Sequence, residues 1–322
     1  MLFKVVIFLS GRRYCMNQNI IKELFPERKE GNIIPACRDR LFKQLFANSN
    51  HIENLEYFIS IVLNIHYEEI KGKVSLLYGE LPVLNYKSKL YVVDIVSELI
   101  NSNRNTSKIN LEVNLDKDKT LEKSGLYASM IYSNGLKVGD NYKKVPSFLQ
   151  VSLDYYDINT KNPRIVKRLF LKDETGEIIY NKFELRHINI AKAKKVWYDD
   201  SISEQEENID LIRLCALLGI TKILDFKKCL EEIEMDENIK KNIIKTVEDY
   251  NKDDNSWLEL DEERDNLMMY NAGITAAEER GIEQGTKNSL LKIAKKMLIK
   301  KAPISEILDL TGLSKEEIKS LM

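Results

Sequence analysis

The sequence is poor in the residues that cross-link small secreted proteins or bind zinc. Only four of its 322 residues are cysteine and three are histidine, and they form no C-x-x-C pair or other spacing typical of metal ligands. We therefore expect neither a disulfide scaffold nor a zinc site, which fits a reducing cytoplasm. Only six residues are proline, which argues against long disordered linkers.

The sequence also lacks a strong net charge and a long hydrophobic run. Its formal net charge is −1, so it has no overall basic signature of nucleic-acid binding. The apolar run within residues 1–15 is too short to span a bilayer and has no small-residue cleavage site. We expect a cytoplasmic protein that binds no membrane, and we interpret the run as a start codon assigned too early, with Met16 as the true start.

The charges are unevenly distributed along the chain. Residues 1–50 carry nine Lys/Arg against four Asp/Glu, a balance of +5, and residues 286–322 carry eight against four, a balance of +4. Residues 199–265 carry nine against 21, a balance of −12. The basic ends suit contacts with phosphate groups, although a solvated helix face is the simpler explanation of any single cluster.

Residues 91–116 hold the most informative pattern. Two apolar, β-branched runs (YVVDIVSELI and INLEVNLD) flank a turn rich in Asn, Ser and Thr, which predicts two antiparallel strands joined by a loop. With the loop centred near Asn103, Asp94 falls opposite Glu112, with Cβ atoms about 5 Å apart. Two like charges so placed repel each other, and a divalent cation between them would remove that cost.

Asn114 adds an amide to the two carboxylates. It lies two residues after Glu112, so both side chains share one face of the strand. Asp94, Glu112 and Asn114 can therefore point at one spot, which suits a Mg²⁺ ion with a polar group beside it. The alternation in both runs is imperfect and the register could slip, so an exposed sheet face without a function stays open as the alternative.

Several short segments form an ordered set of motifs. They are residues 39–46 (DRLFKQLF), 93–94 (VD), 112–114 (EVN), 123–127 (KSGLY), 139–142 (GDNY) and 311–318 (TGLSKEEI). In order and spacing they resemble the motifs of the Rpn family of recombination-promoting nucleases and transposases, a branch of the PD-(D/E)XK nucleases. The resemblance covers the chain from about residue 39 to the C-terminus.

This resemblance implies a fold, a cofactor and a substrate. The fold would be α/β, with a restriction-endonuclease-like mixed sheet flanked by helices and followed by an all-helical C-terminal region. Asp94, Glu112 and the carbonyl of Val113 would bind Mg²⁺, or Mn²⁺ in its place, and the substrate would be DNA. Asn114 would position a water or a phosphate oxygen. It stands where the family has Gln or Lys, and it cannot neutralise developing negative charge as Lys does.

Other charged residues predict contacts around the site. Asp39 and Lys43 lie four residues apart, so on a helix they share a face. They either border the active site, with Lys43 on a phosphate, or form a surface ion pair. Lys123 stands where the family tends to have Arg, and we expect it to contact DNA. Lys315 and Lys319 either lie against DNA, as in a helix-turn-helix, or belong to a docking or dimerisation bundle.

The patterns divide the chain into four regions. We expect an N-terminal extension over residues 1–35, the nuclease-like domain over 36–200, an acidic helical region over 201–270, and a glycine-containing helical connector with a small helix-turn-helix-like element over 271–322. Gly273, Gly281 and Gly285 each weaken the connector helix by about 1 kcal/mol relative to Ala. The connector is therefore either flexible or a contact face between two copies in a homodimer. Ser314 and Glu317 form the capping box that begins the last helix.

Periodicity places elements within these regions. It predicts strands over residues 148–154, 164–171 and 183–190, a helix over 121–132, and a polar break between helices over 250–257 (YNKDDNSW).

Two hypotheses from different functional classes follow. The first is a metal-dependent DNA endonuclease that hydrolyses phosphodiester bonds, in recombination, mobile-element activity or phage defence as the resemblance implies. The presence of both carboxylates, Asp94 and Glu112, favours it. The alternative is a DNA-binding or interaction protein that kept the nuclease fold and cleaves weakly or not at all, which Asn114 favours.

Overall fold

The computed structural model describes residues 18–77, 93–100, 106–115, 120–133, 141–142, 145–202 and 208–321. The chain divides into two compact units, Met1–Glu262 and Glu263–Met322. The four regions expected from the sequence divide the chain more finely and stay a prediction. The expected start at Met16 lies outside the described residues.

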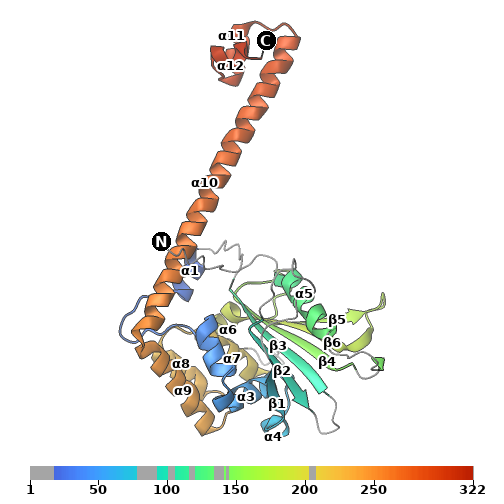
Figure 1. The fold of residues 1–322 in the computed structure, drawn as a ribbon, viewed down its shortest axis with the longest axis vertical. Helices are drawn as coiled ribbons and strands as arrows, with labels where there is room; N and C mark the ends of the chain where they lie inside the picture. Colours follow the sequence, from blue (N-terminus) through green and yellow to red (C-terminus); the bar gives the residue numbers. More distant parts are fainter. Residues whose placement is uncertain are drawn as a thin grey trace, which may run out of the picture. The chain divides into compact units, whose positions relative to one another are not determined.

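A mixed sheet forms the centre of the first unit (Figure 1). Its strands in the described residues are β1 (Val74–Leu77), β2 (Ile95–Ile100), β3 (Thr106–Asn114), β4 (Ser147–Asp154), β5 (Val166–Lys172) and β6 (Ile178–Asn189). They lie in the order β1-β2-β3-β4-β6-β5. The central strands β3, β4 and β6 are parallel, whereas β1, β2 and β5 pair antiparallel with their neighbours. The predicted α/β fold class is confirmed, as are the three strands predicted after the hairpin.

Helices cover both faces of this sheet (Figure 1). The predicted helix after the hairpin forms as α5 (Thr120–Ser133) and lies on one face, while α3 (Ile52–Leu63), α6 (Ile190–Tyr198) and α7 (Ile209–Gly219) lie on the other. Alternation along β3 explains the two layers, because successive side chains point to opposite faces. The apolar Ile109, Leu111 and Val113 share one face, and the polar residues that alternate with them are buried on the face that α5 covers.

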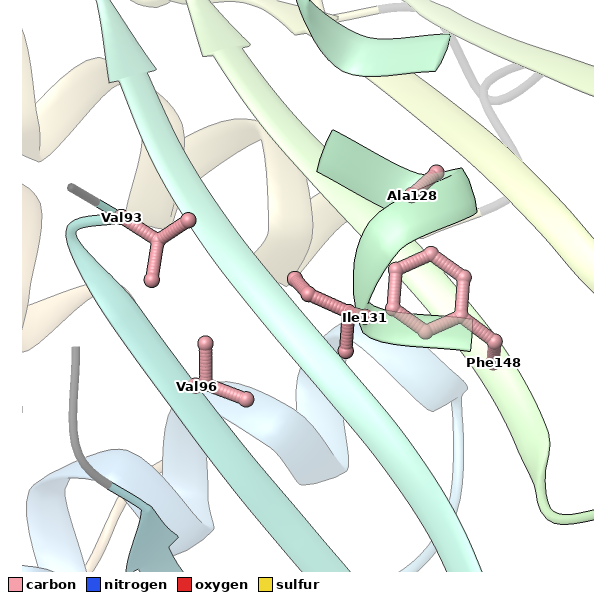
Figure 2. Packing of buried hydrophobic residues seen from close by; sticks show 5 residues of the cluster. All are labelled: Val93, Val96, Ala128, Ile131 and Phe148. Carbon is pink, nitrogen blue, oxygen red and sulfur yellow. The ribbon is translucent and has the colours of Figure 1, made fainter. Parts of the chain in front are cut away.

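An apolar cluster holds α5 against the sheet (Figure 2). It joins the start of β2, helix α5 and strand β4 through Val93, Val96, Ala128, Ile131 and Phe148. Each large apolar side chain that is fully buried in this way contributes about 1.5–3 kcal/mol. The cluster therefore fixes the position of α5, which also carries polar residues to the same face of the sheet.

The other helices of the first unit pack against α3, α6 and α7 and against one another. In the described residues they are α1 (Gln18–Leu24), α2 (Asp39–Phe46), the 3-10 turn Ser49–His51, α4 (Tyr67–Ile70), α8 (Ile223–Glu231) and α9 (Glu237–Lys252). The leucine and phenylalanine residues of α2 are buried. This arrangement leaves Asp39 and Lys43 on the more exposed side of the helix, with 62% and 35% of their side chains accessible.

The second unit is helical where it is described. It contains most of α10 (Asp254–Ile299), together with α11 (Ile304–Thr311) and α12 (Lys315–Lys319). A small core joins them through Ala294, Ile307, Leu313 and Ile318. Gly312 ends α11 with φ +64°, a left-handed conformation that favours glycine. The predicted capping box forms, because Ser314 and Glu317 each accept a hydrogen bond from the other's main-chain N–H.

The predicted polar break over residues 250–257 is wrong in its extent. Helix α9 continues to Lys252 and α10 begins at Asp254, so the interruption is confined to Asp253. The Trp257 indole N–H donates to the Asn251 carbonyl over 2.9 Å, which satisfies a helix-end carbonyl and lets the next helix begin at once. The sequence pattern could not show this contact across the junction.

Helix α10 is continuous through its glycines. Gly273, Gly281 and Gly285 all lie inside it, so the stretch is helical as expected, whereas its flexibility and its role between two copies stay predictions. Among the described residues, no helix is both long enough and apolar enough to cross a membrane.

Candidate active site

The β2–β3 hairpin forms in the register that the sequence predicts. Ile95 pairs with Leu111, which makes Asp94 and Glu112 the next facing pair. The Asp94 N–H donates to Glu112 Oε1 over 3.0 Å, and the Val113 N–H donates to Asp94 Oδ2 over 2.8 Å. Each carboxylate is thus fixed by the main chain of the other segment.

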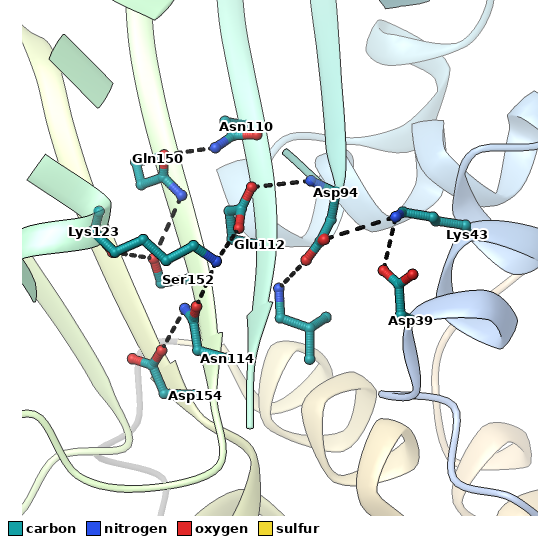
Figure 3. Close-up of polar contacts among 12 residues, drawn as sticks. Asp39, Lys43, Asp94, Asn110, Glu112, Asn114, Lys123, Gln150, Ser152 and Asp154 are labelled. Atoms are coloured by element: carbon teal, nitrogen blue, oxygen red, sulfur yellow. Dashed lines mark hydrogen bonds and ion pairs between the residues drawn. The ribbon is translucent and has the colours of Figure 1, made fainter. Parts of the chain in front are cut away.

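One oxygen of each carboxylate faces a lysine (Figure 3). Asp94 Oδ1 lies 4.0 Å from Lys43 Nζ, and Glu112 Oε2 accepts a hydrogen bond from Lys123 Nζ over 2.6 Å. The side chains of Asp94 and Glu112 are only 7% and 2% exposed. Two buried acids therefore lie side by side, approached by lysines from two different helices. The expected loop centre, Asn103, lies outside the described residues.

Burial disfavours the ionised form of both carboxylates. Desolvation, followed by repulsion from Asp94, raises the pKa of Glu112 to about 7. Desolvation also raises the pKa of Asp94, although the charge of Lys123 opposes the rise. The positive charge nearby therefore does not compensate for removing two carboxylates from water. Additional positive charge between them would stabilise the ionised pair.

Lys123 enters this site from helix α5. Its ammonium donates to Glu112 Oε2 and, over 3.1 Å, to Asn114 Oδ1. The next residue, Ser124, hydrogen-bonds Ser152 of β4 over 2.9 Å and ties the start of α5 to the sheet. The sequence predicted a DNA contact for Lys123, which stays a prediction. Its contact with a carboxylate was not anticipated, because helix packing sets it rather than strand register.

Asn114 is held between opposite partners. Its amide Nδ2 donates to Asp154 Oδ1 over 3.0 Å, while its Oδ1 faces Lys123. Lysine can only donate and an ionised carboxylate can only accept, so both neighbours require this orientation of the amide. Asp154 also hydrogen-bonds His187 Nδ1 over 2.7 Å, and both side chains are buried. Burial raises the pKa of Asp154, although the hydrogen bond to His187 opposes the rise.

His187 is the neighbour that sequence reasoning missed. The strand order places β4 beside β6, and Ser152 pairs with His187 in parallel register. The alternating stretch FELRHIN (residues 183–189) in β6 indicates that His187 points to one face of the strand. Its partner strand could not be known, because β5 separates β4 from β6 in the chain.

The ion pair expected as one of two alternatives for Asp39 and Lys43 forms, and Lys43 also lies close to the carboxylate pair. Lys43 Nζ forms an i,i+4 ion pair with Asp39 over 2.8 Å, and the same ammonium lies 4.0 Å from Asp94 Oδ1. Helix α2 therefore brings a surface ion pair to the border of the carboxylate pair. Contact between Lys43 and a DNA phosphate stays a prediction.

The other residues predicted to bind a metal or DNA are Val113 in β3 and the lysines Lys315 and Lys319 in α12. Val113 contributes its N–H to Asp94, and the role of its carbonyl as a metal ligand stays a prediction. Lys315 and Lys319 belong to the second unit and lie at the two ends of α12. Their contact with DNA also stays a prediction.

The chemistry of the paired acids fits a hard divalent cation. The described residues contain no group of three or more His, Cys, Asp and Glu side chains arranged to hold a metal. Asp94 and Glu112 nevertheless offer two carboxylates, and Mg²⁺ is often bound by one or two carboxylates while waters and substrate phosphates complete its shell. The pair therefore suits an ion whose other ligands come from solvent and substrate.

The segment that contains this site matches a known protein family. A family model described as a PD-(D/E)XK nuclease family transposase matches residues 36–266. The chain belongs to this family. The match includes the hairpin, α5 and β4–β6, so the paired carboxylates of this PD-(D/E)XK protein lie within the family's domain. Membership supports a nuclease- or transposase-like function. Neither a curated protein nor a solved structure gave a significant match.

Proposed function

We propose that the protein is a divalent-metal-dependent DNA endonuclease that hydrolyses phosphodiester bonds at the Asp94–Glu112 pair. The observation that carries the proposal is the pairing of two buried carboxylates, each fixed by the opposing main chain, within a PD-(D/E)XK domain. Burying two like charges side by side lowers the stability of the folded protein, so such a pair indicates a function. Perturbed pKa values also cluster at functional sites.

In this proposal, one set of residues binds the metal ion and another positions a water or a phosphate oxygen. Asp94, Glu112 and the carbonyl of Val113 would hold Mg²⁺ or Mn²⁺. When bound, such an ion supplies a Lewis acid and lowers the pKa of a coordinated water. Asn114, oriented by Asp154, holds a water or a phosphate oxygen.

Contacts outside the carboxylate pair would bind the rest of the DNA. Lys43, at the border of the site, contacts a phosphate next to the scissile one. Lys315 and Lys319 bind DNA outside the first unit, and two copies of the chain contact each other along α10. The setting is recombination or mobile-element activity in the cytoplasm, since the family is one of transposases.

A second candidate is a DNA-binding protein that retains the fold without efficient cleavage. Asn114 favours it, because this residue carries no charge and both ends of its amide are already engaged by Asp154 and Lys123. This candidate predicts metal-independent DNA binding that does not change when Asp94 is replaced.

Cleavage of supercoiled plasmid separates the two candidates. Nicking and linearisation are followed with Mg²⁺, Mn²⁺ or EDTA for the wild type, Asp94→Asn and Asn114→Gln. The control is Glu98→Gln, which neutralises another acid on the same segment. Metal-dependent cutting that survives Glu98→Gln and is lost in Asp94→Asn supports the nuclease. DNA binding without cutting in any metal supports the second candidate.

A further inference from the structure

We propose that Lys123 is the catalytic cation of this site, delivered from helix α5 to the place that a lysine at position 114 would occupy. The inference rests on the proposed nuclease function and goes beyond it. Strand β3 carries the uncharged Asn114 two residues after Glu112, so the strand itself offers no positive charge there. The ammonium of Lys123 lies within hydrogen-bond distance of both side chains, at 2.6 Å from Glu112 and 3.1 Å from Asn114.

The contacts of Lys123 leave it able to reach a substrate. An ammonium has three N–H donors and no acceptor. Within the described part of the chain, two of them are directed to Glu112 and Asn114, which leaves one for a phosphate oxygen. The side chain is 26% exposed, whereas that of Glu112 is 2% exposed. Lys123 therefore extends from the buried carboxylate to a partly exposed position, where a phosphate can reach its ammonium.

Neighbouring groups hold the ammonium in place. The hydrogen bond between Ser124 and Ser152 fixes the start of α5, and the ring of Tyr127, one helical turn later, lies 5.0 Å from Lys123 Nζ. Asp154 turns the carbonyl oxygen of Asn114 toward the same ammonium. A cation held before the substrate arrives can stabilise charge that develops on the scissile phosphate without reorganising.

A purely structural role is the competing explanation, since Lys123 also offsets the buried charge of Glu112. Variants that remove the ammonium at position 123, or supply one from position 114, separate the catalytic role from the structural one. Lys123→Met keeps the unbranched length and removes the ammonium, Lys123→Arg keeps the charge, and Lys123→Met combined with Asn114→Lys returns an ammonium from the strand. Lys108→Met, on the same strand face as Glu112 but away from the pair, is the matched control.

Plasmid cleavage is the first readout. Lys123→Met should cut about 100-fold more slowly than wild type. Lys123→Arg and the combined variant should each recover at least about one tenth of the wild-type rate, and Lys108→Met should cut normally. Cutting by Lys123→Met at the wild-type rate, or no recovery in a folded combined variant, would overturn the inference.

Calorimetric titration of Mn²⁺ into the DNA-free protein is the second readout. Lys123 competes with the ion for Glu112, so Lys123→Met should bind Mn²⁺ more tightly although it cuts more slowly. Loss of Mn²⁺ binding together with loss of cutting would mean that the site has collapsed, and would overturn the catalytic role. A wild type that binds Mn²⁺ and cuts no DNA would instead contradict the proposed nuclease function itself.

Discussion

Asp157, just after β4, pairs with the ammonium groups of both Lys167 and Lys192, whereas Asp94 and Glu112 face one close lysine and one more distant one. Burial raises the pKa of Asp157, but the hydrogen bonds from its two lysines outweigh this effect and hold the pKa below its ordinary value. In the carboxylate pair burial prevails, and both pKa values are raised.

The difference lies in the ratio of cations to carboxylates. Asp157 has two lysine partners, so in this structural cluster its negative charge is fully compensated within the protein and needs no bound cation. Glu112 accepts a hydrogen bond from Lys123, whereas the ammonium of Lys43 lies 4.0 Å from Asp94. The two acids are therefore short of positive charge. Such a deficit destabilises the metal-free protein and favours binding of a cation.

The largest expected effect concerns cleavage. Glu112→Gln should lower the rate of plasmid cutting in Mg²⁺ by roughly 10³-fold or more, because it removes a ligand of an ion that contributes several kcal/mol to catalysis. Asp157→Asn makes the same chemical change in the structural cluster and should leave the rate within about twofold when measured well below its unfolding temperature. Similar losses in the two variants would contradict the distinction between the clusters.

The next effect concerns stability, and here the order of the two clusters is reversed. Asp157→Asn should lower the free energy of unfolding by about 3 kcal/mol, because it leaves the buried ammonium of Lys167 without its partner. Glu112→Gln should not destabilise the metal-free protein at pH 8, since it removes a buried charge. Urea denaturation in EDTA measures both values. Equal destabilisation would show that the carboxylate pair is not short of positive charge.

The pH dependence of stability should expose the raised pKa of Glu112. Its pKa is about 7 in the folded protein against an ordinary value of 4.5, so the folded state retains a proton that the unfolded state releases. In EDTA, the free energy of unfolding should therefore fall as pH rises from 4.5 to 7, by about 3 kcal/mol at most. Glu112→Gln should flatten this slope, and an equally steep slope in that variant would refute the assignment.

The smallest effect concerns the border of the site. Lys43→Met should change stability by about 0.5 kcal/mol or less, because its ion pair with Asp39 is exposed and its ammonium lies 4.0 Å from Asp94, beyond hydrogen-bond distance. If Lys43 also contacts a DNA phosphate, the same change should reduce the salt dependence of DNA binding by about one unit of slope. Fluorescence anisotropy in Ca²⁺ at a series of salt concentrations gives this slope, of the logarithm of the DNA-binding constant against the logarithm of the salt concentration. An unchanged slope would mean that Lys43 forms the ion pair with Asp39 and does not contact a DNA phosphate.

The sequence predicted the elements whose pattern is local. Centring the polar loop near Asn103 predicted Asp94 opposite Glu112, although the imperfect alternation left other registers open, and the observed register agrees with the prediction. The capping box of Ser314 and Glu317 was equally readable, because both partners lie within one turn. In these cases a short segment contains all the groups that determine its geometry.

Contacts that depend on packing between distant segments could not be read in this way. Lys123 reaches Glu112 only because an apolar cluster holds α5 on the polar face of β3. His187 meets Asp154 only because β6, and not β5, lies beside β4. The sequence identified which residues carry charge, but not which helix would supply the cation.

Thermal unfolding with and without Mn²⁺ tests most directly whether the Asp94–Glu112 pair binds a divalent cation. A ligand that binds only the folded state raises the unfolding temperature. Mn²⁺ should therefore stabilise the wild type and Asp157→Asn, but not Glu112→Gln. Equal stabilisation of all three proteins, or of none, would contradict a metal site at this pair.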